Sequence, residues 1–485
     1  MQSLARLLLA FACLFLGPLA VIAKESPANT NEIKSLSPEQ ARKLVETFKG
    51  ECLLLNGLTT LDTATAKALA EFKGERLLLD GLNILDAEIA KALAEFKGQG
   101  LFLSGLTTLN ADTAKALAAF EGQVLFLNGL TTLDADTAKA LAEFKGQLLT
   151  LDGLTTLDAD TAKAIAKCNA WNGFLQKLDT LDGTTAKALA EFKGEFLVLD
   201  GLTKLDANTA KALAEFKAQG LSLDGLTKLD PDTTKALAEF KGQSLNLNGL
   251  TTLDADTAKA LAEFKGQELG LIGLTTLDAD TAKALAEFKG QALFLSGLTT
   301  LDADTARALA EFKGQWLILE GLTTLDADTA KALAGIKGWN GFLPKLAALD
   351  ADTAKALAEF KGERLNLADR AKKAFFKKNP LTLENALAWA AVSGGELTAI
   401  TAFDAPDSVA IAQALATRKG PLALPSLKKI SPKTLTALIE KRDVEIPLIE
   451  TLELIQEPDG SVTEDFDIPE WLEVRQNQQR AGQGR

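Results

Sequence analysis

The sequence contains no His and no Tyr, and it has only one Met and three Cys. Without His, no side chain titrates near neutral pH at its ordinary pKa, and Ser-His and Cys-His nucleophile pairs cannot form. The imidazole ligands that usually hold a catalytic zinc ion are also missing. These absences argue against most hydrolases and metalloenzymes, so we expect no enzyme activity and no cofactor.

Basic residues are also outnumbered, with 52 Lys plus Arg against 65 Asp plus Glu and a formal net charge of −13. A protein that wraps nucleic acid needs a basic surface to neutralise phosphate groups. The charge balance therefore disfavours nucleic acid as a partner. A length of 485 residues, 47% of them apolar, suits several folded domains or one long repeat array.

The N-terminus has the features of an export signal. Residues 1–23 contain one Arg, an apolar run from Leu7, and Val21-Ile22-Ala23 as a small-residue cleavage signature. We expect a cleaved signal peptide and a periplasmic, secreted or cell-surface protein. The alternative is an uncleaved membrane anchor, because about 17 apolar residues lie at the short limit for spanning a bilayer. The oligomeric state is left open.

Leucines recur with a period of 24 residues, which indicates a stacked repeat array. One unit reads LFLNGLTTLDADTAKALAEFKGQL from Leu125. Leu125 and Leu127 alternate around Phe126, as in a short strand with one buried face, and Asn128-Gly129 then favours a turn. The first strand leucines are Leu53, Leu77, Leu101, Leu125, Leu149, Leu197, Leu221, Leu245, Leu269, Leu293, Leu317 and Leu365.

A short helix follows the turn in each unit. Asp134 is predicted to cap its N-terminus, and Lys145-Gly146 to close it with a cation and a glycine of positive φ. Burying five leucines yields roughly 10 kcal/mol, whereas ordering each residue of the unit costs at least about 1 kcal/mol. Units must therefore stack. The same cap position holds Asp62, Asp86, Asn110, Asp158, Asp206, Asp254 and Asp302.

The pattern L-x-L-x-G-L-T-x-L-D-x-x-x-A-x-x-L-A resembles the leucine-rich repeat over residues 37–369, and it is similar to the bacterial-type, cysteine-containing class. The resemblance implies an α/β solenoid: a curved horseshoe with a parallel sheet on its concave face and short helices on its convex face. It also implies binding of macromolecules on the concave face. Leu130 replaces the family's inward Asn or Cys, so the family's asparagine ladder is not expected.

Two units depart from the pattern, at Trp171-Asn172-Gly173-Phe174-Leu175 and at Trp339-Asn340-Gly341-Phe342-Leu343. They lie 168 residues apart, which is seven repeats and suggests a duplicated block. Lys177 and Lys345 replace the turn glycine. We expect a local kink at each of these units, with a special binding role as the alternative.

We expect five regions after the signal peptide. Residues 24–36 form a linker, 37–52 an N-terminal capping half-repeat and 53–369 the array of 24-residue repeats. Residues 370–470 are predicted to be diverged repeats and a cap, because Leu422 and Val444 restore the pattern at a spacing of 22. The basic segment 370–380 favours a helix covering the array over a membrane or nucleic-acid role. Residues 471–485 are expected to be a disordered tail.

The candidate site follows from a comparison of units. Helix surfaces barely vary, whereas the exposed strand positions vary freely, which favours a diversified contact surface over neutral drift. Two apolar patches, Phe102 with Phe126 and Phe294 with Trp316, Ile318 and Phe342, flank a polar stretch that contains Asp200 and Asp224. Such patches mark contact sites. We expect a protein partner, with a glycan as an alternative.

Other interpretations compete with partner binding. The same apolar residues could mediate self-association, or the array could be a cell-surface stalk without a specific ligand. A carboxylate pair such as Asp200 and Asp224 could support glycoside hydrolysis, but similar acids recur along the rim. The D-A-D-T motif lacks the Gly and Glu of a calcium loop. No metal site is predicted.

Overall fold

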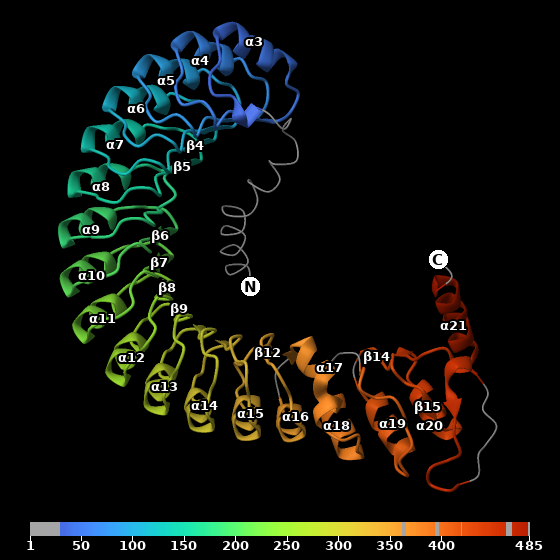
Figure 1. Cartoon of the computed structure of the whole chain (residues 1–485). Helices are drawn as coiled ribbons and strands as arrows, with labels where there is room; N and C mark the ends of the chain where they lie inside the picture. Colours follow the sequence, from blue (N-terminus) through green and yellow to red (C-terminus); the bar gives the residue numbers. More distant parts are fainter. Residues whose placement is uncertain (1–29, 361–364, 393–396, 419, 462–467, 484–485) are drawn as a thin grey trace. The chain divides into compact units, whose positions relative to one another are not determined.

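The computed structural model describes residues 30–360, 365–392, 397–418, 420–461 and 468–483. The predicted signal peptide at 1–23 and the linker residues 24–29 lie outside the described residues. The chain forms two compact units, one running to Gly249 and including Phe264–Gly266, the other formed by Leu250–Glu263 and Gln267–Arg485. Within each unit, helices lie side by side along one face and strands along the other (Figure 1).

The first unit alternates short parallel strands with short helices. Strands β1 to β5 form one sheet in chain order, and β6, β7 and β8 pair in the same way. Its elements are η1 (Thr30–Glu32), α3 (Pro38–Thr47), β1 (Cys52–Leu54), α4 (Thr63–Ala70), β2 (Arg76–Leu78), α5 (Ala87–Ala94), β3 (Gly100–Phe102), α6 (Ala111–Ala118), β4 (Val124–Phe126), α7 (Ala135–Leu141), β5 (Leu148–Thr150), α8 (Ala159–Ile165), α9 (Gly183–Leu189), β6 (Phe196–Val198), α10 (Ala207–Ala214), β7 (Gly220–Ser222), α11 (Pro231–Ala238) and β8 (Ser244–Asn246).

The second unit continues the pattern and then diverges. Strands β9, β10 and β11 pair in parallel, β12 pairs with β13, β14 with β16, and β15 with β17. Its elements are α12 (Ala255–Ala262), β9 (Glu268–Gly270), α13 (Ala279–Ala286), β10 (Ala292–Phe294), α14 (Ala303–Leu309), β11 (Trp316–Ile318), α15 (Ala327–Ala334), β12 (Phe342–Leu343), α16 (Ala351–Ala358), β13 (Asn366–Leu367), α17 (Asp369–Lys378), α18 (Leu383–Ala391), α19 (Ser408–Ala416), β14 (Leu422–Ala423), β15 (Lys429–Ile430), α20 (Pro432–Ile439), β16 (Val444–Glu445), η2 (Ile449–Thr451), β17 (Glu453–Leu454) and α21 (Glu470–Gln483).

The strand–turn–helix repeat predicted from the sequence is confirmed. Leu125, Leu127 and Leu130 are fully buried, whereas Phe126 between the two strand leucines is half-buried on the other side of the strand. Equivalent leucines pair in register, for example Leu101 with Leu125. The interior is therefore one continuous column of leucines within each unit, which explains why a single repeat cannot fold alone.

Aromatic rings form a second buried column, which we call the phenylalanine spine. Phe96 stacks on Phe72 and on Phe120 with ring centroids 6.1 Å apart in both cases, and it is fully buried. The spine in the first unit also includes Phe48 and Phe144. Each ring of the spine follows the end of a helix and packs against the equivalent ring of a neighbouring repeat. The spine therefore adds contacts between repeats that the strand leucines do not make.

The helix caps are confirmed. Asp134 accepts a hydrogen bond from the Thr137 amide at 2.8 Å, and the predicted caps in the other units make the same contact. Hydrogen bonds from the backbone amides of Thr137 and Thr209 favour the charged carboxylates of the exposed caps Asp134 and Asp206 and lower their pKa. Capping fixes where each helix begins.

The glycine assignments require correction. Gly146 and Gly129 do not adopt positive φ; in the described residues only Gly173, Gly341, Gly420 and Gly460 do. A Cβ on Gly146 would lie 2.2 Å from Cζ of Phe144, and one on Gly129 would lie 2.1 Å from the Ser104 carbonyl oxygen. Both positions therefore need glycine because neighbouring atoms occupy the space, and the helix itself ends earlier, at Leu141.

The two irregular units interrupt the regular strand pairing. Isolated bridges join Leu149 with Trp171, Phe174 with Val198 and Leu317 with Trp339, and the second irregular unit also forms the two-residue strand β12, which pairs with β13. Gly173 and Gly341 take positive φ, at 81° and 67°. In each copy the Asn before this glycine accepts a hydrogen bond from the Phe two residues later, at 3.1 Å. The two copies thus have the same local backbone conformation.

The described ends are capped by polar contacts. Linker residues 30–36 belong in part to the N-terminal cap, because Asn31 Oδ1 accepts from the Asn56 amide at 3.1 Å. At the other end, the expected disordered tail is instead helix α21. Its Leu472 is buried, and Gln476 accepts from the Ile449 amide and donates to the Pro447 carbonyl. The tail is ordered because its polar side chains bond to backbone amides and carbonyls of the preceding repeat. Amino-acid composition does not reveal such contacts, so it predicted disorder.

The segment after the array is helical and packed. Phe375 and Ala371 of α17 are fully buried, which fits the expected covering helix. Further on, Leu422 pairs with Val444 in register, at the spacing of 22 seen in the sequence. In the described residues no helix is long and apolar enough to cross a membrane.

Candidate functional site

We call the surface formed by the outward side chains of the strands the strand face. Counting each first strand leucine as position one, side chains at positions zero and two point to this face and position one points to the core. Position four lies on the rim, where the turn begins. In the first unit, Phe102 and Phe126 occupy position two of β3 and β4.

The structure brings Phe102 and Phe126 together. Their rings stack with centroids 4.4 Å apart and planes 11° apart, and both side chains are half-buried. Gly100 makes this possible, because a Cβ there would lie 3.0 Å from the Phe102 ring. Phe196 covers Gly220 in a similar way, because a Cβ on Gly220 would lie 2.4 Å from the Phe196 ring.

The four predicted apolar residues of the second unit come from three neighbouring strands. Phe294 lies opposite Ile318 in the β10–β11 pair, and Trp316 lies opposite Ala292. Trp316 is 40% exposed and Phe342 of β12 is 37% exposed, whereas Phe294 and Ile318 are half-buried. The exposed aromatic pair makes this the more accessible of the predicted patches.

Sequence reasoning missed Ile272, which is 43% exposed at position four of its unit. Most other units place Asn, Asp, Ser or Glu at this position, so the substitution by an aliphatic side chain was the signal. Ile272 follows β9, the strand that pairs with β10 through Gly270 and Phe294. It extends the apolar surface of Phe294, Trp316, Ile318 and Phe342, which together with Ile272 we call the second-unit patch.

Asp200 and Asp224 have a structural use. Asp200 Oδ1 accepts from the Asp224 amide at 3.0 Å and from the Ser222 hydroxyl at 2.6 Å. Asp224 in turn accepts from the amide and the side chain of Asn248, at 2.9 and 3.0 Å. In these units the position-four side chain thus binds the position-four amide of the next unit, and we call this series of contacts the rim ladder.

The rim ladder also occurs in earlier repeats of the first unit. Asn56 accepts from the Asp80 amide at 2.9 Å, Asp80 from the Ser104 amide at 2.7 Å, and Asn128 from the Asp152 amide at 3.3 Å. It lies two positions before Leu130, which occupies the place of the inward Asn or Cys in the common leucine-rich-repeat pattern. The Asp200 and Asp224 carboxylates therefore satisfy backbone amides on the rim.

Burial raises the pKa of Asp200, Asp80 and Asp152, because desolvation penalises the charged carboxylate more than their hydrogen bonds favour it. A group whose folded-state pKa is raised contributes stability at low pH that is lost as the pH rises through that pKa. The exposed cap Asp206 has the opposite sign, since its pKa is lowered.

Asp200→Asn and Asp206→Asn should therefore respond oppositely to pH. Relative to the parent chain, Asp200→Asn should gain stability from about pH 3 to about pH 7, because Asn56 shows that an amide oxygen serves the rim ladder without a charge. Asp206→Asn should lose relative stability over the same range. Urea unfolding of both variants at several pH values measures this, and a shift of both in one direction would contradict it.

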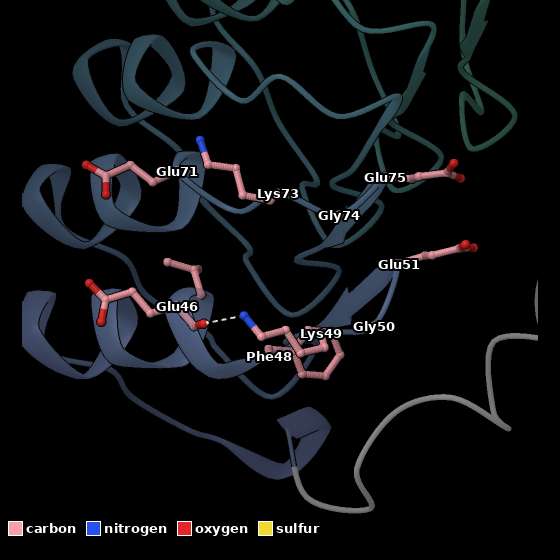
Figure 2. A pocket seen from close by; sticks show the side chains of 10 residues that line it. Glu46, Phe48, Lys49, Gly50, Glu51, Glu71, Lys73, Gly74 and Glu75 are labelled. Atoms are coloured by element: carbon pink, nitrogen blue, oxygen red, sulfur yellow. Dashed lines mark hydrogen bonds between the residues drawn. The ribbon is translucent and has the colours of Figure 1, made fainter.

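A surface hollow lies beside α3 and the start of β2, lined by residues that include Glu46, Glu51, Glu71 and Glu75. Figure 2 shows that these carboxylates do not converge: Glu46 and Glu71 point to one side and Glu51 and Glu75 to the other. Lys49 Nζ donates to the Glu46 carbonyl oxygen at 3.0 Å across the hollow. The arrangement offers no shared ligand position.

Cys52 and Cys168 are free, and Cys168 is buried. Within the part of the chain that the structure describes, no group of three or more Cys, Asp or Glu side chains is placed to hold a metal ion.

Parallel strands alternating with helices in 24-residue repeats, with buried leucines at strand and turn, define an α/β solenoid of the leucine-rich-repeat type. Among solved structures, the chain is similar to TLR13 in a TLR13–ssRNA13 complex, at 17% identity over 89% of this chain and 65% of that chain, with a TM-score of 0.48. It thus spans less than two thirds of that protein.

Two further structures are similar at the level of the fold. Toll in the Drosophila Toll–Spatzle complex shares 12% identity over 79% of this chain and 56% of that chain, with a TM-score of 0.42. LegL7, a leucine-rich repeat-containing protein of Legionella pneumophila, shares 18% identity over 54% of this chain and 95% of that chain, with a TM-score of 0.36. No protein-family model and no curated protein sequence matches the chain.

Proposed function

We propose that the chain is an exported, non-enzymatic repeat scaffold of the bacterial 24-residue type that binds a protein partner on its strand face. The observation that carries this proposal is the second-unit patch. Trp316 is exposed on β11, where Ile318 lies opposite Phe294 of β10, and Phe342 is exposed on β12, the next strand along the chain. Clustered aromatic and aliphatic side chains of this kind dominate the binding energy of protein interfaces.

A protein suits this surface better than a glycan. Ile272 and Ile318 add branched aliphatic groups to the aromatic rings, and aliphatic groups complement apolar side chains better than sugar hydroxyls. The acids that a glycan would need for hydrogen bonding, Asp200 and Asp224, are bonded to backbone amides in the rim ladder. The aromatic and aliphatic residues are thus the proposed partner contacts, and the two aspartates support the scaffold.

Export is proposed from the sequence of residues 1–23, with its apolar run and small-residue cleavage signature. The absence of His from the sequence supports a role without catalysis. The second candidate is a structural spacer at the cell surface. The exposed helix residues barely vary from one repeat to the next, which favours this candidate. A spacer needs no exposed Trp, so Trp316 favours binding.

The proposal predicts that Trp316→Asp together with Phe294→Asp lowers the affinity for the physiological partner by about 30-fold or more, since interface hot spots contribute about 2 kcal/mol each. Residues 24–485 would be immobilised and the proteins captured from the producing organism compared. The matched control carries Lys283→Asp and Arg307→Asp on the helix face and should capture the same partner. Identical capture by both variants would support the spacer instead.

A further inference from the structure

Position zero of the second unit forms a notch between an acid and an aromatic ring. Glu268, Ala292 and Trp316 lie in register on the adjacent strands β9, β10 and β11. Neighbouring strands are about 4.8 Å apart, so the backbones of Glu268 and Trp316 are about 10 Å apart with one methyl group between them. Ala292 is buried and forms the floor.

The walls of this notch complement a cation. The Glu268 carboxylate stands on one side, and the salt bridges of the described residues do not include it. On the other side Trp316 presents an exposed indole ring, and indole is the aromatic group that attracts cations most strongly. The chain already contains this type of contact, with the Arg475 guanidinium 5.4 Å from the Trp471 ring.

We propose that the notch binds a Lys or Arg side chain of the partner. In the partner segment, apolar residues flank this cation and contact the rest of the second-unit patch. This inference rests on the proposed function and names the chemistry of the partner segment. The aliphatic stem of the cation packs over Ala292, and its charge lies between Glu268 and Trp316. Phe294 and Ile318, at position two of the same strands, contact the neighbouring apolar side chains.

The notch is specific to the second unit. Position zero of the other strands in register holds Cys52, Arg76, Gly100, Val124 and Leu148 in one sheet and Phe196, Gly220 and Ser244 in another. None of these sets combines an acid with an exposed indole ring. A cationic partner also suits a chain of net charge −13.

The test uses two peptides that differ by one charge, acetyl-Leu-Lys-Leu-amide and the same peptide with norleucine in place of Lys. Residues 24–485 labelled with 5-fluorotryptophan would be titrated with each, and the Trp316 resonance identified from its loss in Trp316→Phe. We expect this resonance to shift, and the Lys peptide to bind at least about fivefold more tightly than the norleucine peptide. Equal affinity, or no shift of the Trp316 resonance, would overturn the notch.

Glu268→Gln should remove most of the preference for the Lys peptide and leave the norleucine peptide unaffected. Glu311→Gln, an exposed acid paired with Lys313 at the other end of the repeat, is the matched control and should keep the preference. If Glu268→Gln keeps it too, the notch is wrong. Partner capture that depends on Trp316 but not on Glu268 would then leave the proposed function standing.

Discussion

Replacing Phe96 by Ala should lower the free energy of unfolding of the first unit by about 3–5 kcal/mol. Phe96 is fully buried and stacks on both Phe72 and Phe120, so its removal leaves a cavity and interrupts the phenylalanine spine across three repeats. Denaturant unfolding measures the loss, and hydrogen exchange shows whether strands β2 to β4 lose protection together.

Phe102→Ala provides the matched control, since the two rings are six residues apart in the sequence, Phe96 near the end of one repeat and Phe102 at the start of the next. Phe102 is half-buried on the strand face, and its loss removes one ring stack, which contributes about 1 kcal/mol. If both variants cost the same, the spine would contribute no more than a surface contact, and our account of how repeats are joined would be wrong.

Gly105→Ala should destabilise the first unit by about 1–3 kcal/mol through steric overlap. An added Cβ would lie 2.0 Å from the Asp80 carbonyl oxygen and 2.7 Å from that of Leu82, and backbone atoms cannot move aside without disturbing the rim ladder. The φ of Gly105 is not positive, so the effect comes from the neighbouring repeat. Denaturant unfolding of the variant measures it.

The control for this prediction is Gly183→Ala, at the first residue of α9. The nearest atoms to an added Cβ are 3.8 Å away, and α8 and α10 begin with Ala at the same place. Removing unfolded-state freedom at a compatible site should stabilise the chain by about 0.4–1 kcal/mol. A stable Gly105→Ala would show that repeats can separate at the turn without cost.

The periodic part of the fold could be predicted because each local signal repeats. Leu125 and Leu127 indicate the strand, Asp134 the helix cap, and the 24-residue period the stacking, and all agree with one structure. The glycines were wrongly predicted to need positive φ. Gly129 is required because the Ser104 carbonyl of the preceding repeat occupies the space of a Cβ, and Gly146 because the Phe144 ring does, and turn rules consider neither contact.

The candidate site could be predicted only in its apolar part. The alternation of the strands placed Phe102, Phe126, Phe294, Trp316, Ile318 and Phe342 on the strand face, where the structure has them. It did not distinguish Asp200 and Asp224 from free acids, because their hydrogen bonds reach residues 24 positions away. Hydrogen bonds between residues that far apart cannot be recognised from the sequence of a single repeat.

Helix α21 illustrates the same limit at the chain end. Its composition is that of a disordered tail, yet Arg475 donates to the Val444 carbonyl at 2.7 Å and Arg480 pairs with Glu450 at 2.8 Å. These contacts join the tail to residues about a repeat away, which composition cannot show. A helix without an apolar periodicity can thus be ordered by the open end of a solenoid.

The matching irregular units have a consequence for how such a chain changes length. Gly173 and Gly341 share positive φ, and the Asn residues before them make the same bonds, so the segments around them are structurally interchangeable. Unequal crossing-over between the copies would add or delete a whole block of 168 residues while preserving both terminal caps. The repertoire of outward-facing side chains could then grow or shrink in steps without any new folding problem.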